Sequence, residues 1–237
     1  MPKTPNLKIS IIIPVLNEAN TIAPIISTAR NAENVEIIVA DGGSSDGTVE
    51  IAQSLGVRVL STAARRATQM NAGAIAATGD ILLFLHADTH LPRGYDFGVR
   101  QALAKPSSVG GAFELKIDAR RLCLRLVEIG VNWRSHFFQM PYGDQAIFLL
   151  SATFDKIGGF PDLPLMEDFE FVRRLKKQGR IEIVPQPVLT SARRWQQVGV
   201  LKTTIINQIV IIAYFLGVSP DRLGEWYRGK KINSSKN

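Results

Sequence analysis

The sequence predicts an α/β protein with a mostly parallel central sheet flanked by helices. Short apolar, β-branched segments alternate with helical segments through the first half of the chain, a pattern typical of βαβ units. The strand segments are almost continuously apolar, as expected for strands buried on both faces. A length of 237 residues with 46% hydrophobic residues suits one large domain with a substantial core.

The first half contains four predicted strands separated by three predicted helices. The strands are rich in Ile, Val and Leu and cover residues 8–15, 35–40, 58–61 and 80–85. The helices are amphipathic or alanine-rich and cover residues 17–32, 48–55 and 65–77. Gly56 and Gly79 follow the last two helices, where glycine commonly ends a helix.

The second half is less regular. Its predicted strands cover residues 109–117, 146–150 and 181–184. Its predicted helices cover residues 122–134, 169–178 and 199–218. The last of these contains the longest apolar region, whose continuous part is shorter than the roughly 20 residues needed to span a bilayer.

Charge and cysteine content narrow the class of protein. The net charge of +7 suits a nucleic acid, an anionic membrane or a phosphate-bearing substrate. The basic residues form small groups without a nucleic-acid motif, so we expect no nucleic-acid partner. The single cysteine, Cys123, rules out an internal disulfide, and the polar N-terminus lacks a signal-peptide pattern. We therefore expect a cytoplasmic protein.

Ligands of parallel sheets bind beyond the carboxyl ends of the strands, so the residues after each strand are candidates for a site. Asp41 follows the second strand and is placed to accept hydrogen bonds from a base or a ribose. Asp46 lies in the same glycine-rich turn, where it either caps the next helix or contacts the ligand.

Two further carboxylates are candidates for the functional site. Asp88 follows the fourth strand in the segment His86-Ala87-Asp88, and it suits Mg²⁺ or Mn²⁺ bridging the phosphates of a donor. Asp168 precedes a predicted helix, where it either caps the helix or serves as a general base.

Several segments together resemble the inverting glycosyltransferases of family 2, which have the GT-A fold. They are Ile11–Glu18, Asp41–Thr48, Gly79-Asp80 with Leu83–Asp88, and Gly158–Phe160 with Glu167-Asp168. The resemblance covers about Ile9 to Trp195. It is strongest to a small bacterial subgroup with the sequences QMN-GA, HADT and LPLMED, at Gln69–Ala74, His86–Thr89 and Leu163–Asp168. Some members of that subgroup are associated with carotenoid-acid glycosylation.

The resemblance implies a nucleotide-sugar donor of the UDP or GDP type and a role for each motif residue. The implied nucleotide-binding residues are Pro14, Asn17, Glu18, Asp41, Arg66, Asn71, His86, Ala87 and Arg194. Asp88 is the implied metal ligand and Asp168 the implied catalytic base. We assign acceptor binding to Tyr142, Asp144, Gln145, Glu167 and Trp195.

Two departures from the family pattern affect this assignment. His86 stands where the family more often has Asp, which weakens a site for a hard cation. Ser191 replaces the Gln of the QxxRW motif of processive relatives, so a polymer-forming activity loses support.

We predict a single domain, residues 1–237. Residues 8–105 form its nucleotide-sugar-binding part, residues 106–197 its acceptor and catalytic part, and residues 198–232 a C-terminal apolar helical segment. The helix at 199–218 is a core helix, an interfacial membrane helix or a homodimer contact. A membrane helix would place the protein on the inner membrane face and suit a lipid-like acceptor of carotenoid-acid or polyprenyl type. The alternative functions are a catalytically inactive binding module for nucleotide sugar or lipid and a sugar nucleotidyltransferase.

Overall fold

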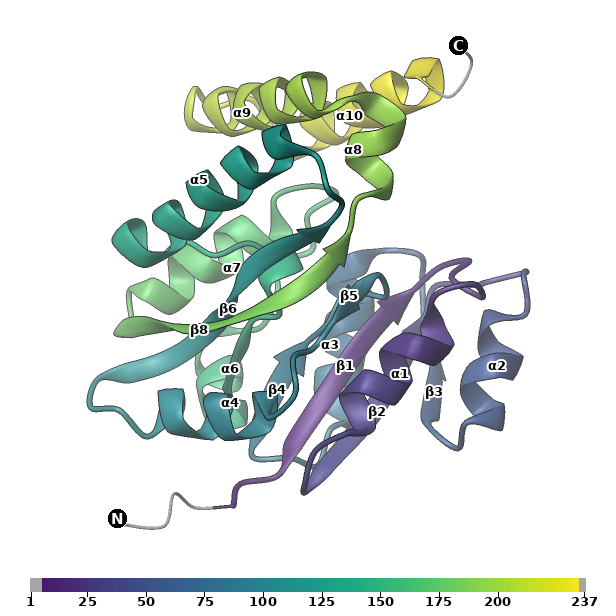
Figure 1. Cartoon of the computed structure of the whole chain (residues 1–237), viewed down its shortest axis with the longest axis vertical. Coiled ribbons are helices and arrows are strands. Elements are labelled where there is room, and N and C mark those ends of the chain that lie inside the picture. The colour runs from purple at the N-terminus through teal and green to yellow at the C-terminus, as the bar shows by residue number, and fades with distance from the viewer. Residues whose placement is uncertain (1–5, 235–237) are drawn as a thin grey trace.

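A single curled sheet runs through the molecule (Figure 1). The computed structural model describes residues 6–234, apart from the side chains of residues 228 and 230–234. The ends of the predicted domain, residues 1–5 and 235–237, lie outside the described residues. The strands are β1 (Ile9–Val15), β2 (Val35–Asp41), β3 (Arg58–Ser61), β4 (Ile81–Phe84), β5 (Thr89–His90), β6 (Ser108–Asp118), β7 (Phe148–Leu150) and β8 (Arg180–Ser191).

Helices cover both faces of this sheet and one of its ends. They are α1 (Ile22–Arg30), α2 (Thr48–Ser54), α3 (Arg66–Ala76), α4 (Tyr95–Leu103), α5 (Leu122–Phe138), the 3₁₀ turn η1 (Gly143–Gln145), α6 (Ser151–Ile157), α7 (Glu167–Lys176), α8 (Arg193–Val198), α9 (Val200–Phe215) and α10 (Pro220–Ser234). Among residues 6–234, no helix is long and apolar enough to cross a bilayer.

The strand order is β3-β2-β1-β4-β7-β6-β8-β5. The four strands of the first half pair in parallel, as their alternation with helices predicts. In the second half, β7 runs antiparallel to both β4 and β6, and β5 runs antiparallel to β8. The long pair β6–β8 is parallel. The fold class is therefore the predicted one, with a regular parallel half and a mixed half.

Two apolar layers hold the sheet between its helices. Side chains alternate along β1, so Ile11 joins α1, α4 and α5 on one face, whereas Ile12 joins α3, α6 and α7 on the other. The second layer contains a cluster of aromatic rings, in which Phe84 contacts Phe154, Phe160 and Phe171. Both layers leave the carboxyl ends of β1, β2 and β4 at one edge.

Two predicted boundaries differ from the structure by five or more residues. The helix expected at 17–32 begins only at Ile22, because Asn17 adopts a left-handed backbone (φ 55°) and the segment before Ile22 is bonded to a neighbouring loop. The strand expected at 181–184 continues to Ser191, because a bulge opposite Phe113/Glu114 accommodates the prolines 185 and 187. Helices α4, α6 and α8 and the strand β5 were not predicted.

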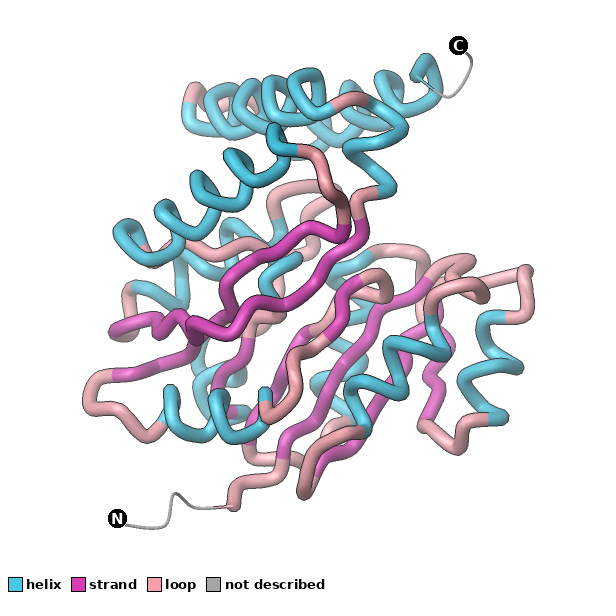
Figure 2. The backbone as a smooth tube through the Cα atoms, viewed as in Figure 1, coloured by secondary structure: helices cyan, strands magenta, loops and turns pink. Residues whose placement is uncertain are grey.

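The end of the chain forms a separate layer of helices above β6 and β8. Helices α9 and α10 lie side by side over this end, and α5 lies next to them (Figure 2). Val210 of α9 packs on Met166 and Phe169 at the start of α7. This contact brings the apolar C-terminal segment next to the residues that the sequence predicts to be catalytic.

Candidate active site

The loops after β1 and β2 are bonded to each other at the carboxyl edge of the sheet. Asn17 donates its backbone N–H to the Ser44 hydroxyl (2.8 Å), and its side-chain oxygen accepts the N–H of Ser45 (2.9 Å). The backbone N–H of Glu18 donates to the Thr48 hydroxyl (2.9 Å). Pro14, the remaining predicted residue of this region, is half-buried near the end of β1. The two predicted nucleotide loops therefore form one preorganised surface.

Asp41 and Asp46 shape the second loop. The buried carboxylate of Asp41 accepts the N–H groups of Gly43 (2.9 Å) and Ser44 (3.1 Å), which folds the turn after β2. Asp46 accepts the N–H of Thr48 at the start of α2 and the N–H of Ala19 in the loop after β1 (both 3.1 Å). Bonds from the Thr48 hydroxyl and these two N–H groups lower the pKa of Asp46. Asp46 therefore has the structural role that the sequence left open.

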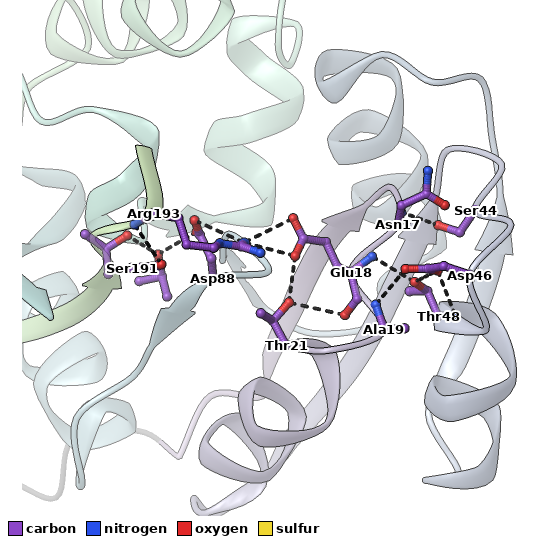
Figure 3. A network of polar contacts seen from close by, with 12 residues as sticks. Asn17, Glu18, Ala19, Thr21, Ser44, Asp46, Thr48, Asp88, Ser191 and Arg193 are labelled. Atoms are coloured by element: carbon purple, nitrogen blue, oxygen red, sulfur yellow. Dashed lines mark hydrogen bonds and ion pairs between the residues drawn. The ribbon is translucent and has the colours of Figure 1, made fainter. Parts of the chain in front are cut away.

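Arg193 connects the first half of the site to the second, although no role was predicted for it. Figure 3 shows its guanidinium between Glu18 and Asp88, at 3.0 Å and 3.7 Å from their carboxylates. The Thr21 hydroxyl donates a further bond to Glu18 (2.7 Å), and Ser191 donates its N–H to the Asp88 carbonyl (3.0 Å). The basic pair Arg193-Arg194 was the available signal, but the family motif drew attention to Arg194.

Asp168 lies in the first turn of α7 and is held by two backbone groups. Its Oδ2 accepts the N–H of Gly143 in η1 (2.9 Å), and its Oδ1 accepts the N–H of Phe169 (2.7 Å). His86 also lies against Gly143, where an added Cβ would come within 2.9 Å of His86 Nε2 and 3.3 Å of Asp168 Oδ2. Asp168 and His86 therefore lie close to the same glycine, although they come from different halves of the chain.

Two other acids near Asp168 have unusually high proton affinity. Burial, followed by the charge of Asp168, raises the pKa of Glu167 to about 7, and Arg66 at 3.6 Å opposes this shift. Burial also raises the pKa of Asp144 to about 6, with Asp168 and Asp88 adding to the shift and Arg134 opposing it. Among the described side chains, Asp144 Oδ1 is one of three buried polar atoms without a hydrogen-bond partner. The acids of this region are thus crowded and incompletely neutralised.

His86 is uncharged across the physiological range. Burial and the nearby charge of Arg66 lower its pKa to about 3. A neutral imidazole still offers one donor and one acceptor to a phosphate or ribose. The neighbouring Ala87 is buried and belongs to the apolar layer on the α1 face.

Two predicted contact residues already have their polar atoms occupied. The Asn71 side chain makes two bonds of 2.9 Å with the backbone of Phe160. Gln145 is fully buried and donates to the Phe113 carbonyl (2.9 Å), while its oxygen accepts bonds from Arg134, Ser135 and Tyr142. Direct acceptor binding by Gln145 is therefore wrong for this structure, because no part of its amide faces outward. Gln145 instead positions Tyr142.

The remaining predicted residues are Tyr142, which precedes η1, and Arg194 and Trp195 of α8. The guanidinium of Arg134 lies 3.4 Å above the ring of Tyr142, and burial raises the pKa of this tyrosine. Arg194 is mostly buried and donates to Asn207 of α9 (2.9 Å), and burial lowers its pKa. Trp195 is half-buried against the apolar layer on the α1 face.

The residues present fit a divalent cation held largely by a substrate. Within residues 6–234, no group of three or more His, Cys, Asp or Glu side chains could hold a metal alone. Mg²⁺ and its relatives commonly bind through one or two carboxylates together with substrate phosphates. Asp88 is one such carboxylate with a partly exposed side chain, and it is near enough to Asp144 to raise that residue's pKa.

Comparison with known proteins decides the family. The family model described as Glycosyl transferase family 2 matches residues 10–154, more than half of the chain. The chain belongs to glycosyl transferase family 2. The match includes the loops after β1, β2 and β4 and the η1 turn, but it ends before Asp168 and Arg193.

Curated relatives of this glycosyl transferase family 2 protein bear transferase names. A PGL/p-HBAD biosynthesis glycosyltransferase of Mycobacterium bovis is 28% identical over 240 aligned positions, which cover 80% of this chain and 91% of that protein. Glycosyltransferase AglJ of Haloferax volcanii is 44% identical over 52 residues, which are 22% of this chain and 17% of that protein. The curated relatives thus support a transferase.

Solved structures share the fold. The mannosyltransferase PcManGT of Pyrobaculum calidifontis, in complex with GDP-Man and Mn²⁺, has a TM-score of 0.61 at 20% identity over 78% of this chain. Residues 1–349 of S. aureus TarS give 0.64 at 16% identity over 86% of this chain, and their complex with UDP-GlcNAc gives 0.62. The aligned region covers 56%, 64% and 58% of those three chains, respectively. These similarities confirm the predicted GT-A fold.

Proposed function

We infer that this protein transfers a hexose from a UDP- or GDP-linked donor to an acceptor hydroxyl or carboxyl, with inversion at the anomeric carbon. The observation that carries this proposal is the position of Asp168 beside His86, at the meeting point of the donor loops and the acceptor half. Family membership supports the transferase class. Two of the solved structures with the same fold contain GDP-Man and UDP-GlcNAc, which supports a donor of this kind.

The proposed reaction is a single in-line displacement. Asp168 takes the proton of the acceptor hydroxyl, the freed oxygen bonds to the anomeric carbon, and the bond from that carbon to the diphosphate breaks. The bonds from Gly143 and Phe169 orient the carboxylate and leave each oxygen with a lone pair for the incoming proton.

Positively charged groups on the donor side of the site support departure of the diphosphate. The negative charge that develops on the diphosphate would be met by Arg66 and Arg194, and by Arg193 if it turns from Asp88. A divalent cation, Mg²⁺ or Mn²⁺, would be held by Asp88, and it would neutralise the leaving diphosphate. Neutral His86 adds no positive charge that would repel such a cation.

The remaining assignments stay part of the proposal. Pro14, Asn17, Glu18, Asp41 and Ala87 would line the nucleoside pocket. Tyr142, Asp144, Glu167 and Trp195 would border the acceptor, which we propose to be lipid-like. Residues 8–105 would serve the donor and residues 106–197 the acceptor. We propose a cytoplasmic location with contact to the inner membrane face.

Replacement of Asp168 by Asn tests the proposal. The substitution keeps the shape of the side chain and removes the base, so we expect the rate of donor cleavage to fall by about 10²- to 10⁴-fold. Release of nucleoside diphosphate from UDP-glucose, UDP-N-acetylglucosamine and GDP-mannose would be measured with saturating Mn²⁺. Binding would be followed by the thermal shift that UDP or GDP, but not ATP, produces, and Asp168→Asn should retain this shift.

Two further variants are the controls. Asp162→Asn removes an exposed carboxylate that pairs with Arg65, and it should leave donor cleavage unchanged. Asp144→Asn removes the neighbouring acid whose pKa is about 6. Near-normal turnover in Asp168→Asn, or a loss found only in Asp144→Asn, would show that Asp168 is not the base.

A further inference from the structure

Helix α5 has its polar side chains facing the protein. Asn132 makes two bonds with the backbone of Leu115 in β6, and Glu128 accepts the N–H of Ile117. Arg125 donates to the carbonyls of Ile117 and Ala119. Strand β6 pairs with β7 over only a short stretch. Beyond it, side chains of α5 bond the backbone N–H and C=O groups that would otherwise be unpaired at this edge. Hydrogen bonding to β6 therefore explains why the inner face of α5 is polar, but it does not explain the residues on the outer face.

The outer face of α5 is an exposed apolar stripe. Leu122, Leu126, Ile129, Trp133 and Phe137 recur at the spacing of one helix face, and all are exposed, Leu126 at 72% and Trp133 at 53%. Phe138 extends the stripe, and the Trp133 ring contacts the rings of both phenylalanines. A helix on the surface of a soluble domain normally shows the opposite arrangement, with its polar face outward.

Helix α9, which contacts α5, carries a second exposed apolar stripe. Leu201, Ile205, Ile209, Ile212 and Leu216 recur at helical spacing and are exposed, and Phe215 is 67% exposed beside them. Helices α5 and α9 contact each other at the same end of the molecule (Figures 1 and 2). The two stripes together expose more large apolar side chains than the isolated ones normal for a soluble protein. We call the exposed residues of these two stripes the α5–α9 surface.

Helices α5 and α9 themselves expose no acidic side chain. Helix α9 contains no acidic residue, and the single acid of α5, Glu128, is buried and paired with Arg125. Exposed Arg120 and Arg121 lie at the start of α5, and exposed Lys202 lies on α9. A two-fold dimer through this surface would set like patches against each other and would offer these cations no carboxylate from either helix. Anionic lipid headgroups would offer them opposite charge.

We propose that the α5–α9 surface docks on an anionic lipid bilayer, with its apolar side chains in the interface between headgroups and acyl chains. The aromatic residues of α5 suit this depth, because rings of this kind favour the membrane interface. Docking would use two adjacent helices and a cationic border rather than a membrane-spanning segment.

This arrangement would also serve the reaction. Val210 on the inner face of α9 packs on Met166 and Phe169, which flank Asp168 in sequence, and Tyr214 donates to Glu170 of α7 (3.1 Å). The docked surface would thus hold the membrane close to the acceptor side of the site, where a lipid-linked hydroxyl or carboxyl could enter. This last step rests on the proposed reaction, whereas docking itself does not.

Vesicle flotation with two charge-matched double variants tests the docking. Leu126→Glu with Ile212→Glu places two acids on the α5–α9 surface, one on each helix. Ile75→Glu with Phe97→Glu makes the same changes at exposed apolar residues of α3 and α4. The full chain would be mixed at low salt with vesicles of phosphatidylcholine, with and without phosphatidylglycerol. We expect the parent and the α3/α4 variant to float only with the anionic vesicles, and the α5/α9 variant to bind them at least tenfold more weakly.

Other results would overturn the proposal. One is a parent protein that does not float with anionic vesicles, and another is an equal loss of binding in both double variants. Sedimentation without lipid would detect a second copy on this surface, as a parent dimer that the α5/α9 variant alone dissociates. The thermal shift by UDP or GDP in lipid-free solution should be the same in all three proteins. Loss of that shift in the parent, with flotation retained, would count against the proposed function alone.

Discussion

The acids of the two halves of the site differ in what neutralises them. In the first half, Asp41 and Asp46 accept backbone N–H bonds within and between the loops after β1 and β2, and they fix the shape of those loops. In the second half, Glu167 and Asp144 are buried near other acids, and their pKa values are raised to about 7 and about 6. The first half therefore uses negative charge to build a rigid surface.

The second half instead keeps carboxyl groups partly protonated near neutral pH. Such groups are common where a protein moves protons, although structural networks produce them as well. Arg193 is the connection between the two halves, because it pairs with Glu18 and Asp88 of the first half from its position at the start of α8. The contrast predicts that variants of the first half change shape and binding, and that variants of the second half change pH dependence.

The largest of these effects is expected at Asp41. Asp41→Ala leaves the N–H groups of Gly43 and Ser44 without their acceptor, so we expect the free energy of unfolding to fall by about 3 kcal/mol. The affinity for UDP or GDP should fall at least about tenfold, since 1.4 kcal/mol corresponds to that factor. Urea unfolding and nucleotide titration would measure both. Asp155→Ala, at an exposed position of α6, should change neither.

Glu167→Gln should alter the pH dependence of stability. The raised pKa of Glu167 means that the folded protein holds this proton more tightly than the unfolded chain. Ionisation therefore lowers the free energy of unfolding as the pH rises from about 4.5 to about 7. Glutamine cannot ionise, so the stability of the variant relative to the parent should increase by about 1–3 kcal/mol between pH 5 and pH 8. Urea unfolding at several pH values would show this trend.

Asp46→Asn is the matched control from the first half. The pKa of Asp46 is lowered, so its stabilising contribution is fully present above the ordinary aspartate pKa and is lost only as the pH falls below it. The variant should be less stable than the parent by a constant amount between pH 5 and pH 8. If both variants gave parallel curves over this range, the proposed difference between the two halves would be wrong.

The smallest effect is expected at Arg193, which joins the halves at a partly exposed position. Arg193→Ala should change the free energy of unfolding by less than about 1 kcal/mol, as is usual for exposed ion pairs. Asp88 would lose a competing cation, so half-maximal donor cleavage should need up to about fivefold less Mn²⁺. Arg193→Lys retains the charge and should stay near the parent value. A higher Mn²⁺ requirement in Arg193→Ala would indicate that Arg193 instead helps to hold the metal-bound donor.

Much of the first half could be predicted because its signals are local. Strands β1, β2 and β4 follow from largely apolar runs, and the position of Asp41 at a strand end follows from the parallel order. The helix start at Ile22 was missed because the bonds that hold Asn17 come from residues 44 and 45. Helical periodicity contains no information about such a distant partner.

The second half depends on contacts between distant segments. The strand β8 passes two prolines because a bulge in its pairing with β6 accommodates them. Gln145 was predicted to bind the acceptor, yet Arg134, Ser135, Tyr142 and the Phe113 carbonyl occupy its amide. The outward-facing apolar stripe of α5 was equally hidden, because periodicity defines a helix face without saying which face the sheet edge requires.

The sequence by itself determined the fold class, the strand-end position of Asp41 and Asp88, and the family motifs, since each of these depends on neighbouring residues or on their order. Tertiary structure alone decided that Arg193 bridges Glu18 and Asp88 and that Asp168 meets His86 at Gly143. It also decided that α5 turns its apolar side outward. The physical reason is that burial, charge pairing and the neutralisation of an acid depend on which groups surround it, and the folded chain brings those groups together from distant positions.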